Sequence, residues 1–170
     1  MVQVKTVVVT PYQQNARILI DEEKNCAVII DPGGDVSLIL DELPEHCNVE
    51  SIWITHSHID HVSGVALLLL ELKTRQSVVP DVMAHPDDQI NRENLPMQSQ
   101  MLGFPYSGDF NITQLIQHGD IIFCGNYEFH VLHTPGHAIG HVSFYFENVL
   151  DSTKPGILIA GDALFKGSIG

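Results

Sequence analysis

Residues 51–61 read SIWITHSHIDH, an apolar run followed at once by three histidines and an aspartate. The wider segment VESIWIT (49–55) has the length and composition of a buried β-strand. Neutral imidazole and carboxylate groups suit zinc, manganese or iron, and four of them in one short turn serve two ions better than one. No cysteine lies among them, which favours a hydrolytic site over a structural zinc site. Ligand type and spacing together favour a metal site over a solvated polar turn. The four metal-competent side chains are His56, His58, Asp60 and His61.

The composition indicates one globular domain over residues 1–170. Of its 170 residues, 44% are hydrophobic and 17% are charged, which suits a single domain with a real core. The formal net charge is −13 with only eight Lys and Arg. A protein with such a negative electrostatic field repels nucleic acid and anionic membranes. An anionic small substrate would need local positive charge, from a metal or from a residue such as Arg17 or Lys166.

Neither the N-terminus nor the longest apolar run predicts contact with a membrane. MVQVKTVVVTPYQQ (1–14) lacks the features of a signal peptide, and VALLLL (65–70) is too short to span a bilayer. The cysteines are odd in number and form no CxxC pair, so we expect reduced, buried thiols. We therefore expect a cytoplasmic protein, and the sequence does not indicate its oligomeric state. The three cysteines are Cys26, Cys47 and Cys124.

Strands followed by helices, in two β-rich halves, predict a layered α/β (α+β) protein with two stacked mixed sheets and helices outside. Asp35 is expected to cap a helix over 36–46, a second helix is expected over 62–75, and 89–118 reads as a long loop or flap with a short helix. Strands are expected within 4–12, 16–23, 25–35, 49–55, 79–88, 119–137, 142–147 and 156–165.

Two further ligand candidates follow predicted strands. In HTPGHAIGH (133–141) the histidines are four apart, but Pro135 and two glycines exclude a helix, so at most one or two face the site. His137 lies in the turn after a strand, as His56 does, and is the favoured ligand. Asp162 follows the apolar strand of GILIAGDALF, where a carboxylate is costly unless paired or metal-bound. A turn or cap aspartate is the alternative for Asp162.

The other polar candidates receive structural interpretations. His133 and His141 are expected to be structural or to support ligands, and Asp31 to form a tight turn that supports them. Asp87 and Asp88, in HPDD, read as a helix start rather than as a catalytic pair. Four histidines are expected at surface or capping positions: His46, His85, His118 and His130.

The motifs together resemble the metallo-β-lactamase superfamily. THSHIDH (55–61) has the H-x-H-x-D-H signature, and DPGGD (31–35), TPGH (134–137) and GD (161–162) occur in the superfamily's order. LPMQSQMLGF and IAGDALFKGSIG are similar to the compact bacterial glyoxalase II-like hydrolases, which are hydroxyacylglutathione hydrolases. The resemblance covers essentially the whole chain.

This resemblance implies a four-layer αββα sandwich with the metal site at one edge, between the sheets. It implies that His56, His58 and His137 hold one divalent ion. Asp60 and His61 would hold a second, and Asp162 would bridge the two. The ions implied are two zinc ions, with iron or manganese as alternatives.

The sequence departs from the superfamily pattern at two places. The second turn reads TPGHAIGH (134–141) where the superfamily commonly has T-P-G-H-T-P-G-H, so we expect a changed loop with His137 intact. The superfamily also carries a later histidine and a basic residue after the position of GSIG (167–170). Neither occurs in the 170 residues, so we expect a C-terminally incomplete fold whose second metal site is one protein ligand short.

The predicted function is metal-dependent thioester hydrolysis. Two neighbouring ions can lower the pKa of a water toward neutrality, and the resulting hydroxide, oriented by Asp60, would attack a thioester carbonyl. A thiolate leaves with little protonation, so no strong general acid is needed. The resemblance implies an S-acylglutathione substrate, of the S-lactoylglutathione type.

Two alternatives are open, and two further functions are disfavoured. An iron-dependent persulfide dioxygenase would use two histidines and a carboxylate, which His56, His137 and Asp162 could supply. A metal-poor, non-catalytic chain or fragment would bind one ion weakly. β-Lactam hydrolysis is disfavoured because the site has no cysteine and the chain no secretion signal, and RNA processing is disfavoured by the charge of −13.

Overall fold

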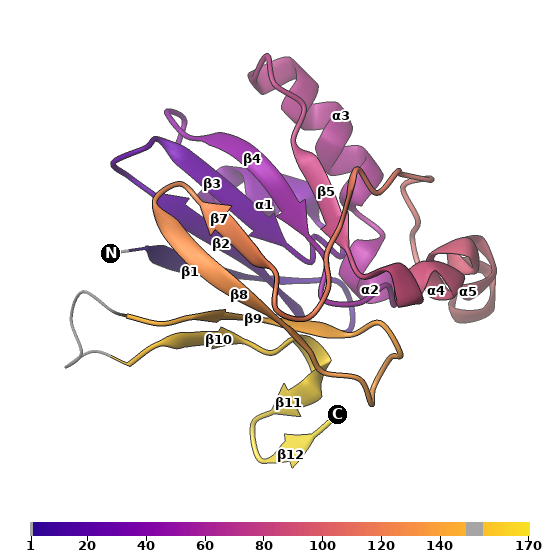
Figure 1. The fold of residues 1–170 in the computed structure, drawn as a ribbon. Helices are drawn as coiled ribbons and strands as arrows, with labels where there is room; N and C mark the ends of the chain where they lie inside the picture. Colours follow the sequence, from indigo (N-terminus) through magenta and orange to yellow (C-terminus); the bar gives the residue numbers. More distant parts are fainter. Residues whose placement is uncertain (1, 149–154) are drawn as a thin grey trace.

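A computed structural model describes residues 2–148 and 155–170. Two stacked sheets, a group of helices and a short C-terminal hairpin of β11 and β12 make up this part of the chain (Figure 1). The strands are β1 Gln3–Val9, β2 Gln14–Asp21, β3 Cys26–Ile30, β4 Asn48–Trp53, β5 Asp81–Ala84, β6 Gln114–Leu115, β7 Ile121–Cys124, β8 Tyr127–His133, β9 Val142–Phe146, β10 Ile157–Ile159, β11 Leu164–Phe165 and β12 Ser168–Ile169. The helices are α1 Val36–Glu42, α2 Ile59–Val62, α3 Val65–Arg75, α4 Gln89–Glu93 and α5 Leu95–Leu102, with 3-10 turns at Pro86–Asp88 and Gly161–Ala163.

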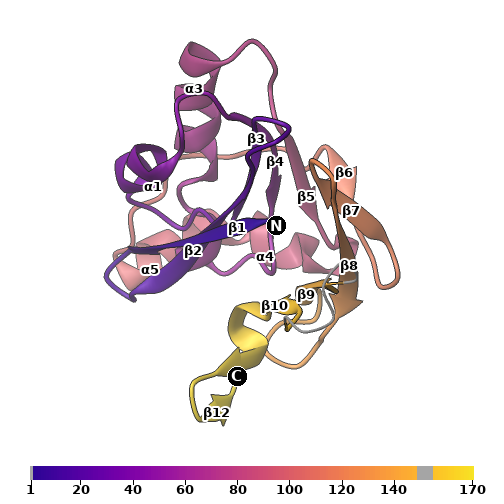
Figure 2. The same ribbon diagram turned by 90° about the vertical axis from the view of Figure 1, so that its left-hand side faces the viewer.

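The first sheet has the order β1-β2-β3-β4-β5-β6. β1, β2 and β3 pair antiparallel, whereas β3 to β6 pair parallel, so this sheet is mixed as expected. Its strands alternate between two hydrophobic clusters, since successive side chains point to opposite faces. In β2, Ile18 and Ile20 join the cluster under α1 and α3, while Leu19 joins the cluster between the sheets. The six-stranded sheet is therefore covered on one face by helices and on the other by the second sheet (Figure 2).

The second sheet has the order β10-β9-β8-β7, and every pairing in it is antiparallel. The expectation of a mixed sheet is wrong here, because tight or short connections join β7 to β8 and β8 to β9, and these permit only antiparallel neighbours. Trp53 of β4 is the centre of the contact between the sheets. Its ring lies 5.3 Å from that of Phe129 and 5.1 Å from that of Phe144, centroid to centroid.

The expected cap of α1 by Asp35 is wrong. Asp35 has a left-handed backbone with φ 44° and makes no side-chain bond to the helix. Its carboxylate instead accepts a hydrogen bond from the backbone N–H of Thr10 at 2.7 Å. A contact between the first turn of the chain and the segment before α1 has displaced a local cap.

The expected helix over 62–75 is interrupted, and the expected loop over 89–118 is more helical than predicted. The chain leaves α2 at Ser63 and begins α3 at Val65. The backbone N–H of Gly64 donates to the carbonyl of Pro32, and a Cβ on Gly64 would lie 2.6 Å from that oxygen. This close approach separates the two helices. Further on, α4 and α5 occupy residues 89–102, and only the segment after them lacks regular structure up to β6.

The ends of three strands from the two sheets meet at one edge of the molecule. The connection from β4 to α2, the segment between β8 and β9, and the 3-10 turn after β10 all lie there (Figure 1). The three cysteines are free and buried, as expected. Among the described residues, no helix has the length and apolar character required to cross a membrane.

Candidate metal centre

Six predicted ligands come together at this edge. Four of them lie on α2 or in the connection from β4 to it, and two more follow β8 and β10. The ring of His56 lies 4.5 Å from that of His58 and 4.8 Å from that of His137, centroid to centroid. Two groups of side chains emerge from this arrangement: His56, His58 and His137 in the first, and His61, Asp60 and Asp162 in the second.

In the first group three ring nitrogens converge. Nδ1 of His58 lies 3.0 Å from Nε2 of His56 and 2.9 Å from Nε2 of His137. Zinc–nitrogen bonds of 2.0–2.1 Å in a tetrahedron would separate such nitrogens by about 3.3 Å. The observed spacing is close to this value, so the three imidazoles can share one ion after a small outward shift.

A chain of hydrogen bonds determines which nitrogen of His56 faces the site. The hydroxyl of Thr55 donates to Asp31 at 2.6 Å, and it therefore accepts from Nδ1–H of His56 at 3.1 Å. Nε2 of His56 is then unprotonated and free to bind a cation. Burial, followed by the neighbouring rings of His61 and His58, lowers the pKa of His56, which keeps the ring neutral. Burial and the ring of His137 likewise lower the pKa of His58.

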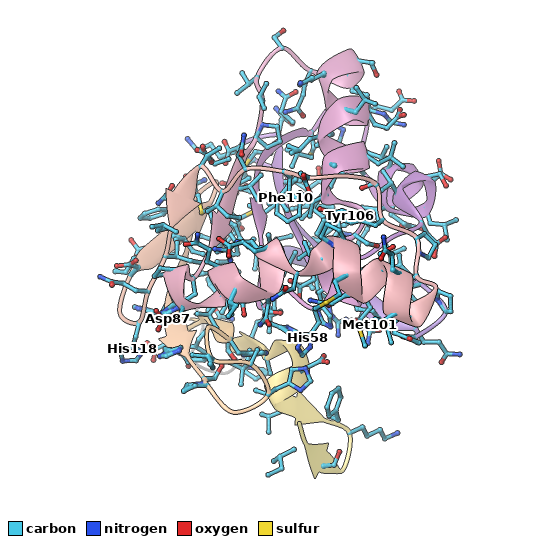
Figure 3. All side chains as sticks on the ribbon, turned by 90° about the vertical axis from the view of Figure 1, so that its right-hand side faces the viewer. His58, Asp87, Met101, Tyr106, Phe110 and His118 are labelled. Atoms are coloured by element: carbon cyan, nitrogen blue, oxygen red, sulfur yellow. The ribbon has the colours of Figure 1, made fainter. Side chains whose placement is uncertain are left out.

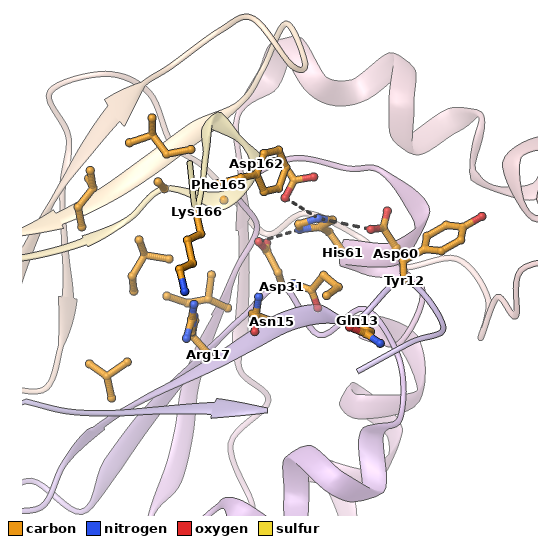
Figure 4. A pocket seen from close by; sticks show the side chains of 18 of the residues that line it. Tyr12, Gln13, Asn15, Arg17, Asp31, Asp60, His61, Asp162, Phe165 and Lys166 are labelled. Carbon is orange, nitrogen blue, oxygen red and sulfur yellow. Dashed lines mark hydrogen bonds and ion pairs between the residues drawn. The ribbon is translucent and has the colours of Figure 1, made fainter. Parts of the chain in front are cut away.

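The second group surrounds Nε2 of His61. This nitrogen lies 3.3 Å from Oδ1 of Asp162 and 3.6 Å from Oδ2 of Asp60, while Nδ1 lies 3.0 Å from Oδ2 of Asp31 (Figure 4). Burial disfavours the charged ring, but bonds to Asp162 and Asp31 outweigh it and raise the pKa of His61 to about 10. The carboxylates thus stabilise positive charge at Nε2. Their negative charge is the environment that a divalent cation requires.

Asp162 faces both groups. Its Oδ1 lies 3.3 Å from His61 and its Oδ2 lies 3.4 Å from Nε2 of His137. Burial opposes ionisation of this carboxyl, but the bond to His61 and the charges of His61 and His137 lower its pKa. A carboxylate with one oxygen toward each group can bridge two ions. The donor set therefore fits a pair of divalent metals, with three imidazoles at the first position, Asp60 and His61 at the second, and Asp162 between them.

Close backbone contacts hold the loops of the site together. A Cβ on Gly33 would overlap the carbonyl oxygen of Asp60, so the Pro-Gly-Gly turn and α2 can approach only because residue 33 is glycine. Gly161 has φ 50°, and a Cβ there would lie 2.7 Å from both Nε2 of His141 and Oγ1 of Thr55. These glycines place Asp60 and Asp162 at their observed positions.

His141 supports the site. Its ring is fully buried, and Nε2 accepts the backbone N–H of Asp162 at 3.1 Å. Nδ1–H then donates to Thr134 at 2.9 Å. Burial lowers the pKa of His141 to about 4, which maintains the neutral form that this bond requires. His133, the other histidine of the turn, donates from Nε2 to the carbonyl of Ile139 at 2.8 Å and does not join the ligand groups.

His85 and Asp88 are more buried than the sequence indicated. His85 does cap the 3-10 turn, accepting from the N–H of Asp87, but it is only 6% exposed. Asp88 is 1% exposed. The sequence read Asp88 as part of a helix start and gave no signal of this burial, because the burial results from contacts with loops distant in sequence.

In the part of the chain that the structure describes, two other groups have metal-type side chains but lack the geometry of the main site. His85 and His133 stack with ring planes 9° apart, so their nitrogen lone pairs lie in nearly parallel planes and do not converge on one point. Nδ1 of His85 is also occupied by the N–H of Asp87. The group of Glu22, His46 and Cys47 consists of an exposed pair and one buried thiol. Burial and nearby carboxylates raise the pKa of that thiol, which disfavours the thiolate that binds metal.

A cavity of about 770 Å³ opens beside the second group. Asp31, Asp60, His61 and Asp162 form its inner end, and Arg17 and Lys166 also line it (Figure 4). The remaining wall comes largely from β10 and from the segment Tyr12 to Asn15. A small organic substrate can therefore reach the carboxylates.

Comparisons with known proteins agree with this geometry. The chain is 34% identical over 170 residues to hydroxyacylglutathione hydrolase GloC of Haemophilus influenzae, covering 98% of this chain and 74% of that protein. The structure of BLEG-1, described as a B3 metallo-beta-lactamase, superposes with a TM-score of 0.79 at 30% identity, over 99% of this chain and 76% of that one. TTHA1623, solved in a di-iron-bound form, gives a TM-score of 0.77 at 30% identity, over 98% and 75% of the two chains.

The fold class expected from the sequence is confirmed, and these relatives support a metal-dependent hydrolase. The family profile described as Metallo-beta-lactamase superfamily matches residues 9–170. The two groups of histidines and carboxylates lie at the edge of the stacked sheets, as the resemblance implied. Because the profile matches nearly the whole length of the chain, the chain belongs to the metallo-β-lactamase superfamily.

Proposed function

We propose that this chain, as one domain, is a metal-dependent thioesterase acting on S-acylglutathione conjugates of the S-lactoylglutathione type. The observation that carries the proposal is Asp162, which directs one oxygen toward His61 and the other toward His137. This arrangement suits two metals, for which we propose zinc. The name of the Haemophilus influenzae relative supplies the substrate class.

When bound, two divalent ions supply Lewis acidity and a water of lowered pKa. The residues of the chain prepare the site for them. Asp31 and Thr55 fix the imidazole tautomers of His61 and His56, so that both rings direct Nε2 inward. The side chain of Asp60 is 20% exposed and lines the cavity, where it can accept a hydrogen bond from the attacking water and orient it.

The cavity has features that suit an anionic thioester. Arg17 and Lys166 are two of only eight basic residues in a chain of net charge −13, and both line this cavity. The carboxylates of a glutathione conjugate could pair with them while its thioester carbonyl lies near Asp60. The leaving thiol has an ordinary pKa of about 8.5, so it departs as thiolate with little need for an acid.

The test compares three reactions on one preparation. The purified chain is stripped with chelator and reloaded separately with zinc, iron(II) and manganese, and bound metal is quantified. Each form is then assayed for S-lactoylglutathione hydrolysis, for oxygen consumption with glutathione persulfide and for cleavage of a cephalosporin. We expect thioester hydrolysis by the zinc form and none by the stripped chain. Metal-replete protein without thioesterase activity would contradict the proposal.

A persulfide dioxygenase is the second candidate. His56, His61 and Asp162 lie within 4.8 Å of one another, so His61 takes the place of the predicted His137, and two imidazoles with one carboxylate suit iron(II). The relative solved with two irons adds a reason to include that metal. Oxygen consumption by the iron form, with no thioester hydrolysis by any form, would favour this function.

A further inference from the structure

The segment from His85 to Arg92 contacts both loops that carry the histidines of the first group. It comprises a 3-10 turn and the start of α4. Figure 3 shows His58 just below the helical segment and Asp87 near its beginning. Asp88, the next residue, is 1% exposed and is not among the candidate ligands. A buried carboxylate is costly unless it is hydrogen-bonded, so its partners indicate its role.

The first partner is the loop of His56 and His58. The backbone N–H of Ser57 donates to Oδ2 of Asp88. Ser57 lies between the two histidines, so this bond fixes the peptide that joins them. Arg92 of α4 approaches the same residue, with Nη1 3.4 Å from Oγ of Ser57.

The second partner is the loop of His137. Gly140 packs directly on Asp88, and a Cβ on Gly140 would lie 2.5 Å from the backbone nitrogen of Asp88 and 2.6 Å from its Cβ. The ring of His85 stacks on His133 at the start of the same loop, with 4.4 Å between centroids. The two loops therefore meet on one short segment, although 79 residues separate His58 from His137 in sequence.

The other oxygen of Asp88 ties this segment to a wider network. Oδ1 accepts from Nδ2 of Asn91 at 2.6 Å. The carbonyl of Asn91 accepts from Gln98 of α5, and Gln98 in turn accepts the N–H of Ile59 at 3.1 Å. The loop is thus held at Ser57 and again at Ile59, on both sides of His58.

We infer that Asp88 is a positioning residue that holds the two histidine loops at the spacing needed for one shared metal ion. The inference rests on the proposed ligand role of His56, His58 and His137. Both carboxylate oxygens already have donors, Ser57 and Asn91, so Asp88 acts through the backbone and not by binding the ion. Its contacts with Ser57, Asn91 and Gly140 lie within the protein and do not involve the substrate.

The experiment compares Asp88→Asn and Asp88→Ala with the matched control Asp87→Asn, whose side chain is 58% exposed. Zinc affinity is measured by competition with a chromophoric chelator, and the visible spectrum of the cobalt(II) form reports ligand geometry. We expect zinc affinity to fall about 10–100-fold in Asp88→Ala, as for loss of a group that orients ligands. The fall should be smaller in Asp88→Asn, which can still accept from Ser57, and absent in Asp87→Asn.

Gly140→Ala provides a test without a change of charge. It should also weaken zinc binding and alter the cobalt spectrum, because the added Cβ separates the loops at Asp88. Wild-type zinc affinity and an unchanged cobalt spectrum in both Asp88→Asn and Gly140→Ala would overturn the inference, even if Asp88→Ala fails to fold. A wild-type chain that binds zinc but leaves thioesters intact would overturn the proposed function. The zinc affinities of the variants could still be compared with that of the wild type. A wild-type chain that binds no zinc would overturn both.

Discussion

Oδ2 of Asp31 lies 3.0 Å from Nδ1 of His61, and the same oxygen accepts the hydroxyl of Thr55 at 2.6 Å. One buried carboxylate therefore orients a predicted ligand of each group, His61 directly and His56 through Thr55. Asp31→Asn replaces one acceptor by a donor and disturbs both tautomers. We expect about a 10–100-fold loss of metal affinity, measured by chelator competition. Asp35→Asn, in the same turn, should retain wild-type affinity, and equal losses in both variants would contradict this role.

Asp60→Asn should reduce thioester hydrolysis far more than stability. The amide keeps the size of the side chain but is a weaker acceptor for the attacking water, so we expect kcat to fall roughly 10²-fold or more. The side chain is partly exposed, so the free energy of unfolding should change by less than about 1 kcal/mol. Turnover and urea unfolding are measured on the same metal-loaded sample. Unchanged turnover would remove Asp60 from the mechanism.

Lys166→Gln should act on substrate binding. Loss of a positive charge from the cavity wall should raise KM for S-lactoylglutathione roughly two- to fivefold, in the range of an exposed ion pair. A neutral thioester without carboxylates should show no such change. Lys24→Gln, in the turn between β2 and β3, serves as the control for net charge. If both substrates respond equally to Lys166→Gln, the residue does not recognise the glutathione carboxylates.

Gly161→Ala should disturb the site and the fold together. A left-handed backbone and contacts at 2.7 Å with His141 and Thr55 oppose any side chain at this position. We expect a loss of about 2 kcal/mol or more in the free energy of unfolding, with weaker metal binding because Asp162 is displaced. Gly167→Ala is a control with a positive φ and open space around the Cβ. It should cost less stability and leave metal affinity unchanged.

The contact between the sheets should dominate core stability. Phe144 of β9 is fully buried against Trp53, so Phe144→Ala should cost about 3–5 kcal/mol. Phe123 of β7 is 52% exposed on the same sheet, and Phe123→Ala should change stability by less than about 1 kcal/mol. Thermal and urea unfolding of the metal-free variants measure both. Similar costs for the two would show that the sheets are not held by the Trp53 cluster.

The sequence predicted those parts of the site that depend on local context. His56, His58, Asp60 and His61 are contiguous and follow a buried strand, so their proximity needed no tertiary information. His137 was favoured because it occupies a turn after a strand, and the structure brings it beside His58. The assignment of each ligand to one ion stays a prediction, as do zinc and the cytoplasmic location.

Features that depend on distant contacts were not predictable from local patterns. Asp35 has the composition of a helix cap, but Thr10 binds its carboxylate across 25 residues. The apolar periodicity of 62–75 continues through Gly64, whereas Pro32 interrupts the helix there. Asp88 looks like any acidic helix start, and only the fold shows that Ser57 and Gly140 bury it.

The strand that leads to Asp162 has few connections of its own. Within residues 2–148 and 155–170, β10 contributes three residues and pairs with β9 alone, at the edge of its sheet. β4, which precedes the contiguous histidines, is an interior strand with a partner on each side. Edge strands with few hydrogen bonds open at a lower free energy than interior ones. Local opening of β10 would therefore withdraw Asp162, the carboxylate that faces both groups, while His56, His58 and His61 remain in place.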